Sequence, residues 1–552
     1  MDITQALSSA RKKLGYPAEI AASDATILDV FFIAVANYGE RPAFSCMGKT
    51  LTFTDLDRLS AQFAAYLQQH TNLKPGDRIA LQLPNILQYP VAMFGALRAG
   101  LVIVNTNPLY TPREMQHQFA DSGARAIVVL VNMAKKVQDV LANTQLSYVF
   151  VTEMGDLHPL PKRLLINAAV KYVKKMVPAY ELPQAISLQH SLSKMHGKQP
   201  TKVTLKKNDI ALLQYTGGTT GIAKGAVLTH ANLIANMLQC EPYLERAGIG
   251  KKAEVIIAPL PLYHIYAFML HCVSMLAHGS HSVLIPNPRD MTAFIKEMTH
   301  YRFSMFVGLN TLFVGLMAHA KFAELDFSNL KLTMSGGMAL TEAAASRWQE
   351  ATGCAVLEGY GLTESSPVVS INPAGHARIG TIGLAVPSTE IKIISDDGES
   401  LPVGEIGELC VRGPQVTQGY WQNAEATSKT IIDGWLYTGD IAQVEADGFM
   451  RIVDRKKDMI IVSGFNVYPN EIENVVAMHP DVMECAAIGV PDSGSGETVK
   501  LFVVARNASL TAEALRAFAK ENLTAYKVPR QIEFRNELPK SNVGKVLRRE
   551  LR

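Results

Sequence analysis

The sequence contains 552 residues, too many for a single hydrophobic core, so we expect two or more domains. Hydrophobic residues make up 48% and charged residues 19%, which is typical of globular proteins, and a net charge of +3 does not indicate a nucleic acid partner. The six cysteines have no C-x-x-C spacing, and the first residues lack the pattern of a signal peptide, so we expect a cytoplasmic protein.

Short apolar runs alternate with longer amphipathic ones along the first part of the chain. Residues 78–83 and 126–131 are predicted strands, and residues 87–98 form a predicted helix whose small residues allow close packing. Residues 255–286 are strongly apolar but are interrupted by prolines and histidines, so we expect buried strand and helix there and not a membrane span. The alternation predicts α/β layers with largely parallel sheets.

The pattern changes near residue 381, where glycines and prolines become frequent and the runs between them become short and β-rich. We predict a β-subdomain there, and a small α+β domain after the charged residues 454–458. Its predicted elements are a helix at 470–478, strands at 484–490 and 499–505, and a helix at 511–521. The predicted division is therefore an N-terminal domain over 1–453 and a C-terminal domain over 454–552.

The clearest chemical motif is the stretch 215–225, Tyr-Thr-Gly-Gly-Thr-Thr-Gly-Ile-Ala-Lys-Gly, which follows a predicted strand at 210–213 and precedes a predicted helix at 231–240. Its glycines allow successive backbone N–H groups to surround an anion, while its threonines and Lys224 add donors and positive charge. The spacing G-x-x-x-x-G-K-[ST] is absent in every register, so this is a different kind of nucleotide loop. The alternative is an ordinary glycine-rich turn between strand and helix.

Four later motifs are weak when taken one at a time. Residues 358–364 place Tyr360 between glycines, where it could cover a purine, and end in Glu364, a hard oxygen ligand suited to Mg²⁺. Asp440 follows a glycine turn and could accept ribose hydroxyls, although an Asx-type turn explains it equally well. The charged run at 454–458 and the glycine-flanked Lys545 are, by themselves, ordinary solvated features.

In this order and spacing, the five motifs resemble the adenylate-forming superfamily of acyl-CoA synthetases, luciferases and peptide-synthetase adenylation domains, over residues 28 to 549. The match is most similar to bacterial long-chain fatty acyl-CoA synthetases at residues 260–268, 286–290 and 433–461. The resemblance implies stacked αβ subdomains and a β-subdomain in the N-terminal domain, followed by a small mobile C-terminal domain. It implies ATP, Mg²⁺ and coenzyme A as cofactor and co-substrates, a fatty acid as substrate, and a homodimer.

The resemblance also implies a role for each motif residue. Lys545, His264, Thr363 and Glu364 are the expected catalytic residues, and Glu364 and Thr219 the expected metal ligands. The expected nucleotide-binding residues are Thr216, Gly217, Gly218, Thr219, Thr220, Gly221, Lys224, Gly336, Gly337, Glu358, Gly359, Tyr360, Gly361, Asp440, Arg455, Lys457 and Gly464. A hinge at 454–457 would alternate Lys545 with residues 463–465, the latter lining a thiol tunnel.

Two further segments concern the acyl substrate. Residues 266–275 and 306–317 are apolar and could line a tunnel for a long chain, although core packing explains them equally well. Residues 162–180 are basic and amphipathic, which suits peripheral contact with the inner membrane but also describes a solvated helix.

The predicted function is ligation of a long-chain fatty acid to coenzyme A through an acyl-adenylate, with release of AMP and pyrophosphate. One alternative is a ligase for a medium-chain or aryl acid, or for an acceptor other than coenzyme A. Another is a non-catalytic nucleotide-binding scaffold at a membrane, which would have lost Lys545, Glu364 or Thr219, and all three are present.

Overall fold

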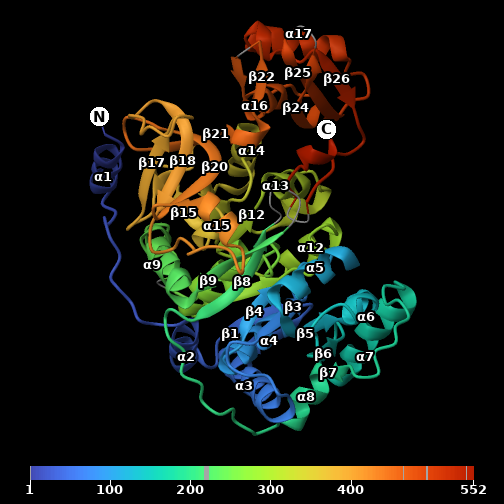
Figure 1. Cartoon of the computed structure of the whole chain (residues 1–552). Helices are drawn as coiled ribbons and strands as arrows, with labels where there is room; N and C mark the ends of the chain where they lie inside the picture. Colours follow the sequence, from blue (N-terminus) through green and yellow to red (C-terminus); the bar gives the residue numbers. More distant parts are fainter. Residues whose placement is uncertain (1, 217–222, 251, 464, 493–494, 542–543) are drawn as a thin grey trace.

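The structure is a computed structural model that describes residues 2–216, 223–250, 252–463, 465–492, 495–541 and 544–552. A large body holds two stacked sheets and a smaller β-subdomain, and the C-terminal domain lies above it (Figure 1). The predicted α/β architecture with a small C-terminal domain is confirmed.

The two large sheets of the body are mostly parallel, with antiparallel pairs at their edges. One has seven strands in the order β7-β6-β5-β3-β4-β8-β9: β3 (Arg78–Gln82), β4 (Val102–Asn105), β5 (Ala124–Leu130), β6 (Tyr148–Thr152), β7 (Ile186–Ser187), β8 (Ile210–Thr216) and β9 (Lys224–Thr229). The other has nine strands in the order β16-β15-β14-β13-β12-β10-β11-β1-β2: β1 (Pro42–Cys46), β2 (Lys49–Thr52), β10 (Val255–Ala258), β11 (His281–Leu284), β12 (Met305–Gly308), β13 (Leu332–Ser335), β14 (Val356–Gly361), β15 (Val368–Ile371) and β16 (Leu384–Ala385).

Helices fill the space between these sheets and cover their outer faces. The helices of the body are α1 (Ile3–Leu14), α2 (Ile27–Tyr38), α3 (Phe53–His70), α4 (Gln88–Arg98), α5 (Pro112–Ser122), α6 (Ala134–Leu141), α7 (Leu160–Ala168), α8 (Leu188–Lys194), α9 (His230–Arg246), α10 (Ile265–Ala267), the π-helical η3 (Phe268–Ser274), α11 (Met275–Ala277), α12 (Met291–Met298), α13 (Asn310–Met317), α14 (Glu342–Thr352) and α15 (Ala424–Thr430). Every residue of α4 is buried in the central core, which takes side chains from both sheets. A side chain at Gly95 of α4 would collide with Phe63 of α3 at 2.7 Å, so the helices pack this closely only with glycine there.

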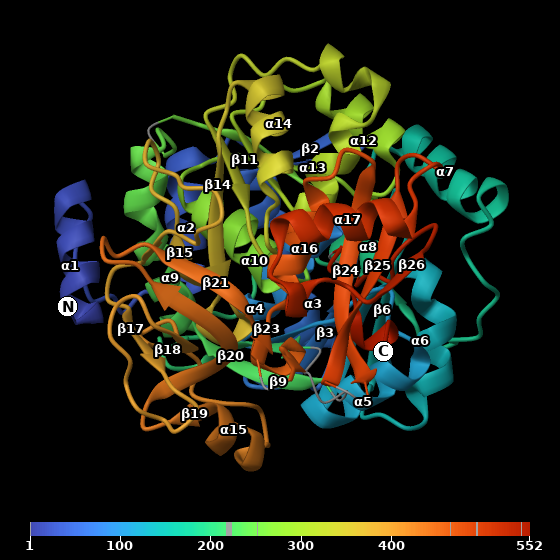
Figure 2. The ribbon, with the colours of Figure 1, turned by 90° about the horizontal axis from the view of Figure 1, so that it is seen from above.

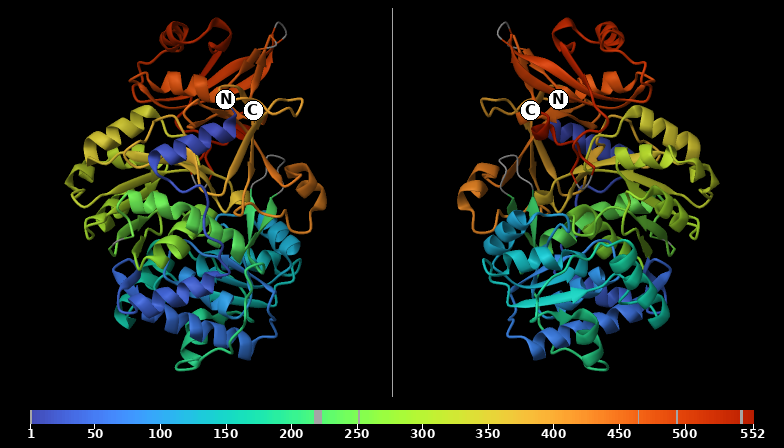
Figure 3. Two further views of the ribbon diagram at one scale, coloured as in Figure 1. Left: turned by 90° about the vertical axis from the view of Figure 1, so that its left-hand side faces the viewer. Right: turned by 90° about the vertical axis from the view of Figure 1, so that its right-hand side faces the viewer.

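The β-subdomain is an antiparallel sheet of β17 (Glu390–Ile394), β18 (Ile406–Arg412), β19 (Ile431–Ile432), β20 (Trp435–Val444) and β21 (Met450–Arg455). The N-terminal helix α1 packs Ile3 and Leu7 into its core, so the start of the chain lies beside β17 (Figures 1 and 3).

The C-terminal sheet has the order β23-β22-β25-β24, with β26 pairing to β25. Its strands are β22 (Ile460–Val462), β23 (Phe465–Val467), β24 (Val482–Asp492), β25 (Gly496–Ala505) and β26 (Gln531–Phe534), and its helices are α16 (Pro469–Ala477) and α17 (Ala512–Asn522). The chain crosses from the β-subdomain to this sheet through the single turn η6 (Lys456–Asp458). The crossing falls in the charged run, where the sequence predicts the end of the N-terminal domain.

The predicted elements agree with the structure to within a few residues. The apolar stretch 255–286 forms β10, the helical run from α10 to α11, and β11, all largely buried, as expected. Among the described residues, no helix has the length and apolar character needed to span a bilayer.

Candidate active site

The predicted phosphate loop connects β8 to β9, which pair antiparallel and bring Thr216 opposite Lys224. Gly217, Gly218, Thr219, Thr220 and Gly221 lie outside the described residues, so their predicted roles remain predictions. At the far end of the loop, the Lys224 ammonium lies 5.2 Å from the centre of the Tyr420 ring. Cation–π attraction therefore fixes the lysine beside the loop.

Tyr420 also reaches the predicted metal ligand. Its hydroxyl donates a 2.7 Å hydrogen bond to Oε1 of Glu364, and the backbone oxygen of Glu364 accepts a 2.8 Å bond from Thr417 N. Burial and the glutamate charge both raise the pKa of Tyr420, so the phenol stays neutral and remains a donor. One aromatic side chain thus links Lys224 to Glu364, a role that the sequence did not reveal.

In the motif at residues 358–364, the close approach of the chain requires glycine at position 361. A Cβ on Gly361 would lie 1.9 Å from the carbonyl oxygen of Pro367, which is a direct overlap. After it, Thr363 and Glu364 form a short turn, and the backbone N–H of Leu362 donates to Oγ of Ser365. The tight packing of this turn against residues 365–367 sets the position of Glu364.

The predicted purine site lies at the ends of neighbouring parallel strands. Gly336 and Gly337 follow β13, and Glu358 and Gly359 are in β14, which pairs with β13. A Cβ on Gly336 would come within 3.3 Å of the Gly359 carbonyl oxygen, and Gly337 has φ +85°, so both positions favour glycine. Burial raises the pKa of Glu358 to about 8, so its carboxyl is largely protonated at neutral pH.

The predicted ribose site is a connected set of three side chains. The Tyr360 hydroxyl donates to Oδ2 of Asp440 at 2.5 Å, and Arg455 Nε lies 3.4 Å from Oδ1 of the same aspartate. Asp440 is in β20 and Arg455 opposite it in β21, so the β ladder holds the pair in register. Each carboxylate oxygen of Asp440 thus has one protein partner, and the contacts of Tyr360 with a purine and of Asp440 with ribose hydroxyls remain predictions.

His264 begins the helix α10, and its Nδ1 accepts a 3.3 Å hydrogen bond from the backbone N–H of Tyr266. Burial lowers the pKa of His264 to about 4, so the imidazole is neutral at physiological pH. The strand end before it is held by Asn85, whose buried amide donates to the Ala258 and Leu260 carbonyls at 2.9 and 2.8 Å. Asn85 is a positioning residue that no sequence motif marked.

An apolar pocket lies beside this histidine's helix. Its lining residues are Asn236, Cys240, Tyr243, Leu244, Tyr266, Met269, Leu270, Ser274, Leu332, Met334, Leu357, Pro367, Val368 and Ile371. The predicted lining from residues 266–275 therefore reaches this pocket. Residues 306–317 do not line this pocket, and their predicted role in a tunnel remains a prediction: Phe306 stacks on the buried Trp348 and Phe313 meets it edge-on in a separate aromatic core, whereas Val307 and Leu309 belong to the central core.

Lys545 comes to the site from the C-terminal domain. Its backbone N–H donates to Oγ of Ser541, and the next glycine back, Gly544, lies so close to Thr311 of α13 that a Cβ would be 2.6 Å from its hydroxyl. Burial, followed by the charge of Arg455, lowers the pKa of Lys545 to about 7, whereas Asp440 raises it. Lys545 therefore shares one electrostatic environment with the predicted ribose site.

The residues of the crossing segment anchor this arrangement. Asp454 is fully buried and accepts a 2.8 Å bond from the backbone N–H of Asn470, at the start of α16. The guanidinium of Arg548 forms a salt bridge with Glu473 in α16, with 2.8 Å between nitrogen and Oε1. Lys457 is exposed beside this cluster, and Gly464 lies outside the described residues. Among the described residues, no group of three or more His, Cys, Asp or Glu side chains forms a metal cage.

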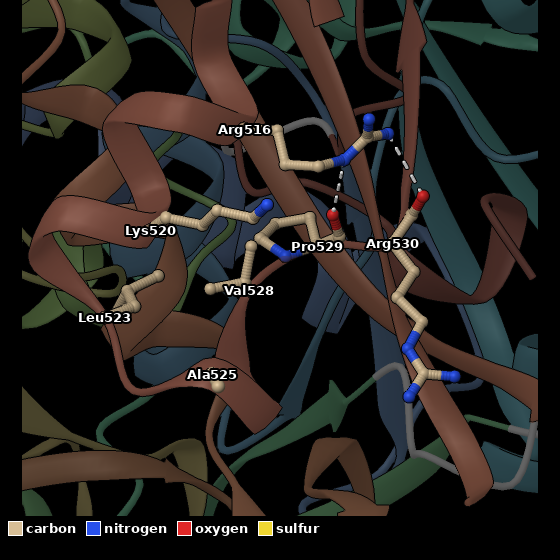
Figure 4. A pocket seen from close by; sticks show the side chains of 7 residues that line it. All are labelled: Arg516, Lys520, Leu523, Ala525, Val528, Pro529 and Arg530. Carbon is tan, nitrogen blue, oxygen red and sulfur yellow. Dashed lines mark hydrogen bonds between the residues drawn. The ribbon is translucent and has the colours of Figure 1, made fainter. Parts of the chain in front are cut away.

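The C-terminal domain also carries an open basic pocket (Figure 4). It is lined by Arg516, Lys520, Leu523, Ala525, Val528, Pro529 and Arg530. Figure 4 shows the Arg516 guanidinium turned to the Pro529 and Arg530 carbonyl oxygens, at 3.3 and 3.1 Å, while Lys520 extends into the pocket. Nearby, the exposed Phe465 stacks on Tyr526 with ring centres 4.8 Å apart.

Two family models match the chain in the order of these features. Residues 31–421 match the AMP-binding enzyme model, and residues 471–545 match the AMP-binding enzyme C-terminal domain. The chain belongs to the AMP-binding enzyme family. The resemblance stated from the motifs is thereby confirmed.

Relatives with established names agree with this assignment. A long-chain-fatty-acid–CoA ligase of Escherichia coli O6:H1 is 53% identical over 96% of this chain and 94% of its own. A ligase of the same name from Haemophilus influenzae is 52% identical over 96% and 94%. Among solved structures, an anthranilate CoA ligase in complex with anthranoyl-AMP matches with TM-score 0.84 at 25% identity, covering 96% of this chain and 97% of that one.

Proposed function

We propose that this enzyme ligates a long-chain fatty acid to coenzyme A at the expense of ATP, through an acyl-adenylate, releasing AMP and pyrophosphate. The observation that carries the proposal is the position of Lys545, which shares one electrostatic environment with Asp440 and Arg455. The two relatives that are 53% and 52% identical in sequence to this chain are named for the same activity. The apolar pocket beside α10 supplies a dry site for an acyl chain.

In the first step, a carboxylate oxygen attacks the α-phosphorus of ATP. The bond between the α-phosphorus and the oxygen that bridges to the β-phosphorus breaks, and pyrophosphate leaves with that oxygen. Two anions must approach each other, and we assign Lys545 to offset their repulsion and to hold the charge that develops on the α-phosphate oxygens. Thr363 would donate to the α-phosphate. The neutral His264 would orient the carboxylate by hydrogen bonding without adding a charge.

We propose that residues 216–224 hold the β- and γ-phosphates and that Asp440 and Arg455 hold the ribose. Gly336, Gly337 and residues 358–361 would enclose the adenine, with Lys457 and Gly464 contributing when the domains rotate. The carboxylate of Glu364 fits Mg²⁺ as a ligand. One of its oxygens accepts the hydrogen bond from Tyr420, and the carboxylate can bind a hard cation that also takes phosphate oxygens. Thr219 would be the second protein ligand. When bound, Mg²⁺ neutralises phosphate charge.

In the second step, the coenzyme A sulfur attacks the acyl carbonyl carbon, the thiol proton is lost, and AMP leaves with the bridging oxygen. We propose that rotation about residues 454–457 withdraws Lys545 and brings residues 463–465 to the acyl group. The basic pocket at Lys520 and Arg530 suits the phosphates of coenzyme A, which carries several negative charges.

Two coupled assays test the proposed function. Pyrophosphate release should depend on the acid, and thioester formation should depend on coenzyme A, with the highest kcat/KM for acids of long chain. A preference for aryl or medium-chain acids would move the substrate assignment to the alternative. Pyrophosphate release without any thioester product would instead point to another acceptor.

A cytoplasmic location, peripheral contact with the inner membrane and a homodimer complete the expectations from the sequence. The exposed basic segment at residues 160–173 supports the membrane contact.

A further inference from the structure

The segment that follows β6 projects from the edge of the body. It begins with α7 and continues as the π-helical η2 (Ala169–Val173), and none of the residues in either element is buried (Figures 1 and 2). Both views place it at the periphery, away from the C-terminal domain in Figure 1. A helix of a globular protein normally buries an apolar stripe, so this exposure requires another explanation.

The helix is attached to the body by its polar face. The side chain of Asn167 accepts a 2.7 Å hydrogen bond from Gly155 N and donates a 2.9 Å bond to Oε2 of Glu153. Gly155 packs so closely that a Cβ there would lie 3.0 Å from the Arg163 carbonyl and 3.1 Å from Ile166. The face containing residues 163, 166 and 167 is therefore turned toward the protein.

Large apolar side chains of this segment are nevertheless left in solvent. At about 100° per residue, Leu165 lies on the far side of the helix from Asn167, and Leu164 lies at the side, about 60° from Asn167. Leu164 is 58% exposed, Leu165 72%, Tyr172 68% and Val173 79%. The segment thus makes polar contacts with the body through Asn167, while its large apolar side chains remain in solvent.

Positive charge surrounds this apolar face. Residues 157–180 contain five lysines and arginines (Lys162, Arg163, Lys171, Lys174 and Lys175) and no aspartate or glutamate. All four of the lysines are exposed, and the ammonium of Lys162 donates to the Met47 carbonyl oxygen of the body, which leaves Lys171, Lys174 and Lys175 as the lysines beyond α7. The carboxylates of Glu153 and Asp156 lie on the protein side of the helix, where both accept hydrogen bonds from Asn167.

We infer that α7 and η2 dock this enzyme in the interface of an anionic lipid bilayer. An apolar face flanked by lysines fits a bilayer, because the apolar side chains enter the acyl boundary while the ammonium groups meet the phosphates of the lipids. A second copy of this chain would bring the same uniformly positive surface to this face, which opposes self-association. The inference deepens the proposed peripheral contact and names its surface and lipid class.

Flotation of the full-length protein with vesicles tests the inference. The vesicles contain either phosphatidylcholine alone or equal parts of phosphatidylcholine and phosphatidylglycerol, with no fatty acid, ATP or coenzyme A present. Wild type should bind the phosphatidylglycerol vesicles much more tightly. The variant L164S/L165S/Y172S should lose at least about tenfold in partitioning, because its apolar insertion is removed. Charge reversal in K171E/K174E/K175E should lose about a hundredfold on the anionic vesicles.

The matched control replaces three exposed apolar residues on other elements. I406S/I432S/M483S removes side chains that are 44%, 38% and 44% exposed, and it should bind vesicles as wild type does. All variants should keep pyrophosphate release with a water-soluble acid, so a failure of docking is separate from a failure of the ligase. If L164S/L165S/Y172S or K171E/K174E/K175E floated with anionic vesicles as well as wild type does, the inference would be overturned. It would also be overturned by conversion of a dimer to a monomer by L164S/L165S/Y172S without loss of vesicle binding, since the face would then be an interface between copies.

Discussion

At the scale of single residues, the charge of Lys545 depends on its neighbours. Burial and Arg455 both favour the neutral amine, and only Asp440 opposes them, so the pKa lies near 7. The phosphates of ATP supply the missing negative charge, which makes the lysine a fully charged donor when the nucleotide is bound. A lysine in this setting binds substrate charge more strongly than a solvated lysine would.

Replacing Lys545 by alanine should slow adenylation by about 10²–10³-fold, the cost of one preorganised donor in the transition state. Thioester formation from pre-made acyl-adenylate should be unchanged, because that step uses the other domain orientation. Pyrophosphate release and thioester formation are measured separately. K540A is the matched control, since Lys540 lies in the same turn but pairs with Glu484 at 2.6 Å. Equal losses in both half-reactions would contradict the assignment.

The same lysine predicts a pH dependence. The protonated form carries the charge, so kcat/KM for pyrophosphate release should fall as pH rises through about 7, the pKa in the free enzyme. The fall in kcat should come at higher pH, because bound phosphates raise the pKa. K545R keeps its positive charge over this pH range. Its kcat/KM should be lower than that of wild type, but it should not fall as pH rises through about 7. Identical profiles for the two proteins would assign the pH dependence to another group.

Single residues also show where sequence reasoning stops. Asp440 and Lys545 are more than a hundred residues apart, and it was the resemblance of the ordered motifs to a known family that predicted a site shared by Asp440, Arg455 and Lys545. Tyr420 and Asn85 were missed, because each acts through one hydrogen-bonded neighbour that is distant in sequence. A lone tyrosine or asparagine gives no periodic or spacing signal.

At the scale of elements, hydrophobic periodicity located the strands and helices well. It could not decide which residues of an apolar segment face which core. Within residues 306–317, Phe306 and Phe313 pack with Trp348, whereas Val307 and Leu309 belong to the central core, and only the three-dimensional neighbours of β12 and α13 distinguish the two sides. Similarly, the composition of α7 shows an amphipathic helix, but not that its large apolar side chains remain exposed.

The turn after β14 makes a prediction at this scale. G361A places a Cβ where the Pro367 carbonyl oxygen lies 1.9 Å away, so the backbone must shift and stability should fall by about 2–3 kcal/mol. G359A, in the same strand, makes an ordinary contact at 3.4 Å and serves as the control. Chemical unfolding of the two variants measures the difference. An equal effect of both substitutions would show that the close approach is not what requires glycine.

At the scale of the whole molecule, the two domains meet at the turn that carries Lys545. The ideal Cβ position of Gly544 is 3.8 Å from Cβ of Thr311 in α13, which matches the usual separation across a disulfide. Both positions are partly buried, as are Cys240 and Cys485, so selective oxidation of an introduced pair rests on this short separation of its Cβ atoms. A crosslink here would hold Lys545 in its site and prevent the proposed rotation.

Oxidised T311C/G544C should therefore retain acid-dependent pyrophosphate release while it loses thioester formation at least about a hundredfold, and a reductant should restore the second step. Each single-cysteine variant controls for the substitutions, including the strain of a side chain at the φ of +81° that Gly544 adopts. If the oxidised protein forms thioester at the rate of its reduced form, the orientation that places Lys545 in the site also serves the thiol, and rotation about residues 454–457 is not needed. Loss of both half-reactions on oxidation, together with full activity of the singles, would instead show that Lys545 must leave the site before the adenylate can form. The ratio of the two rates in one oxidised sample thus separates rotation between the steps from rotation before them.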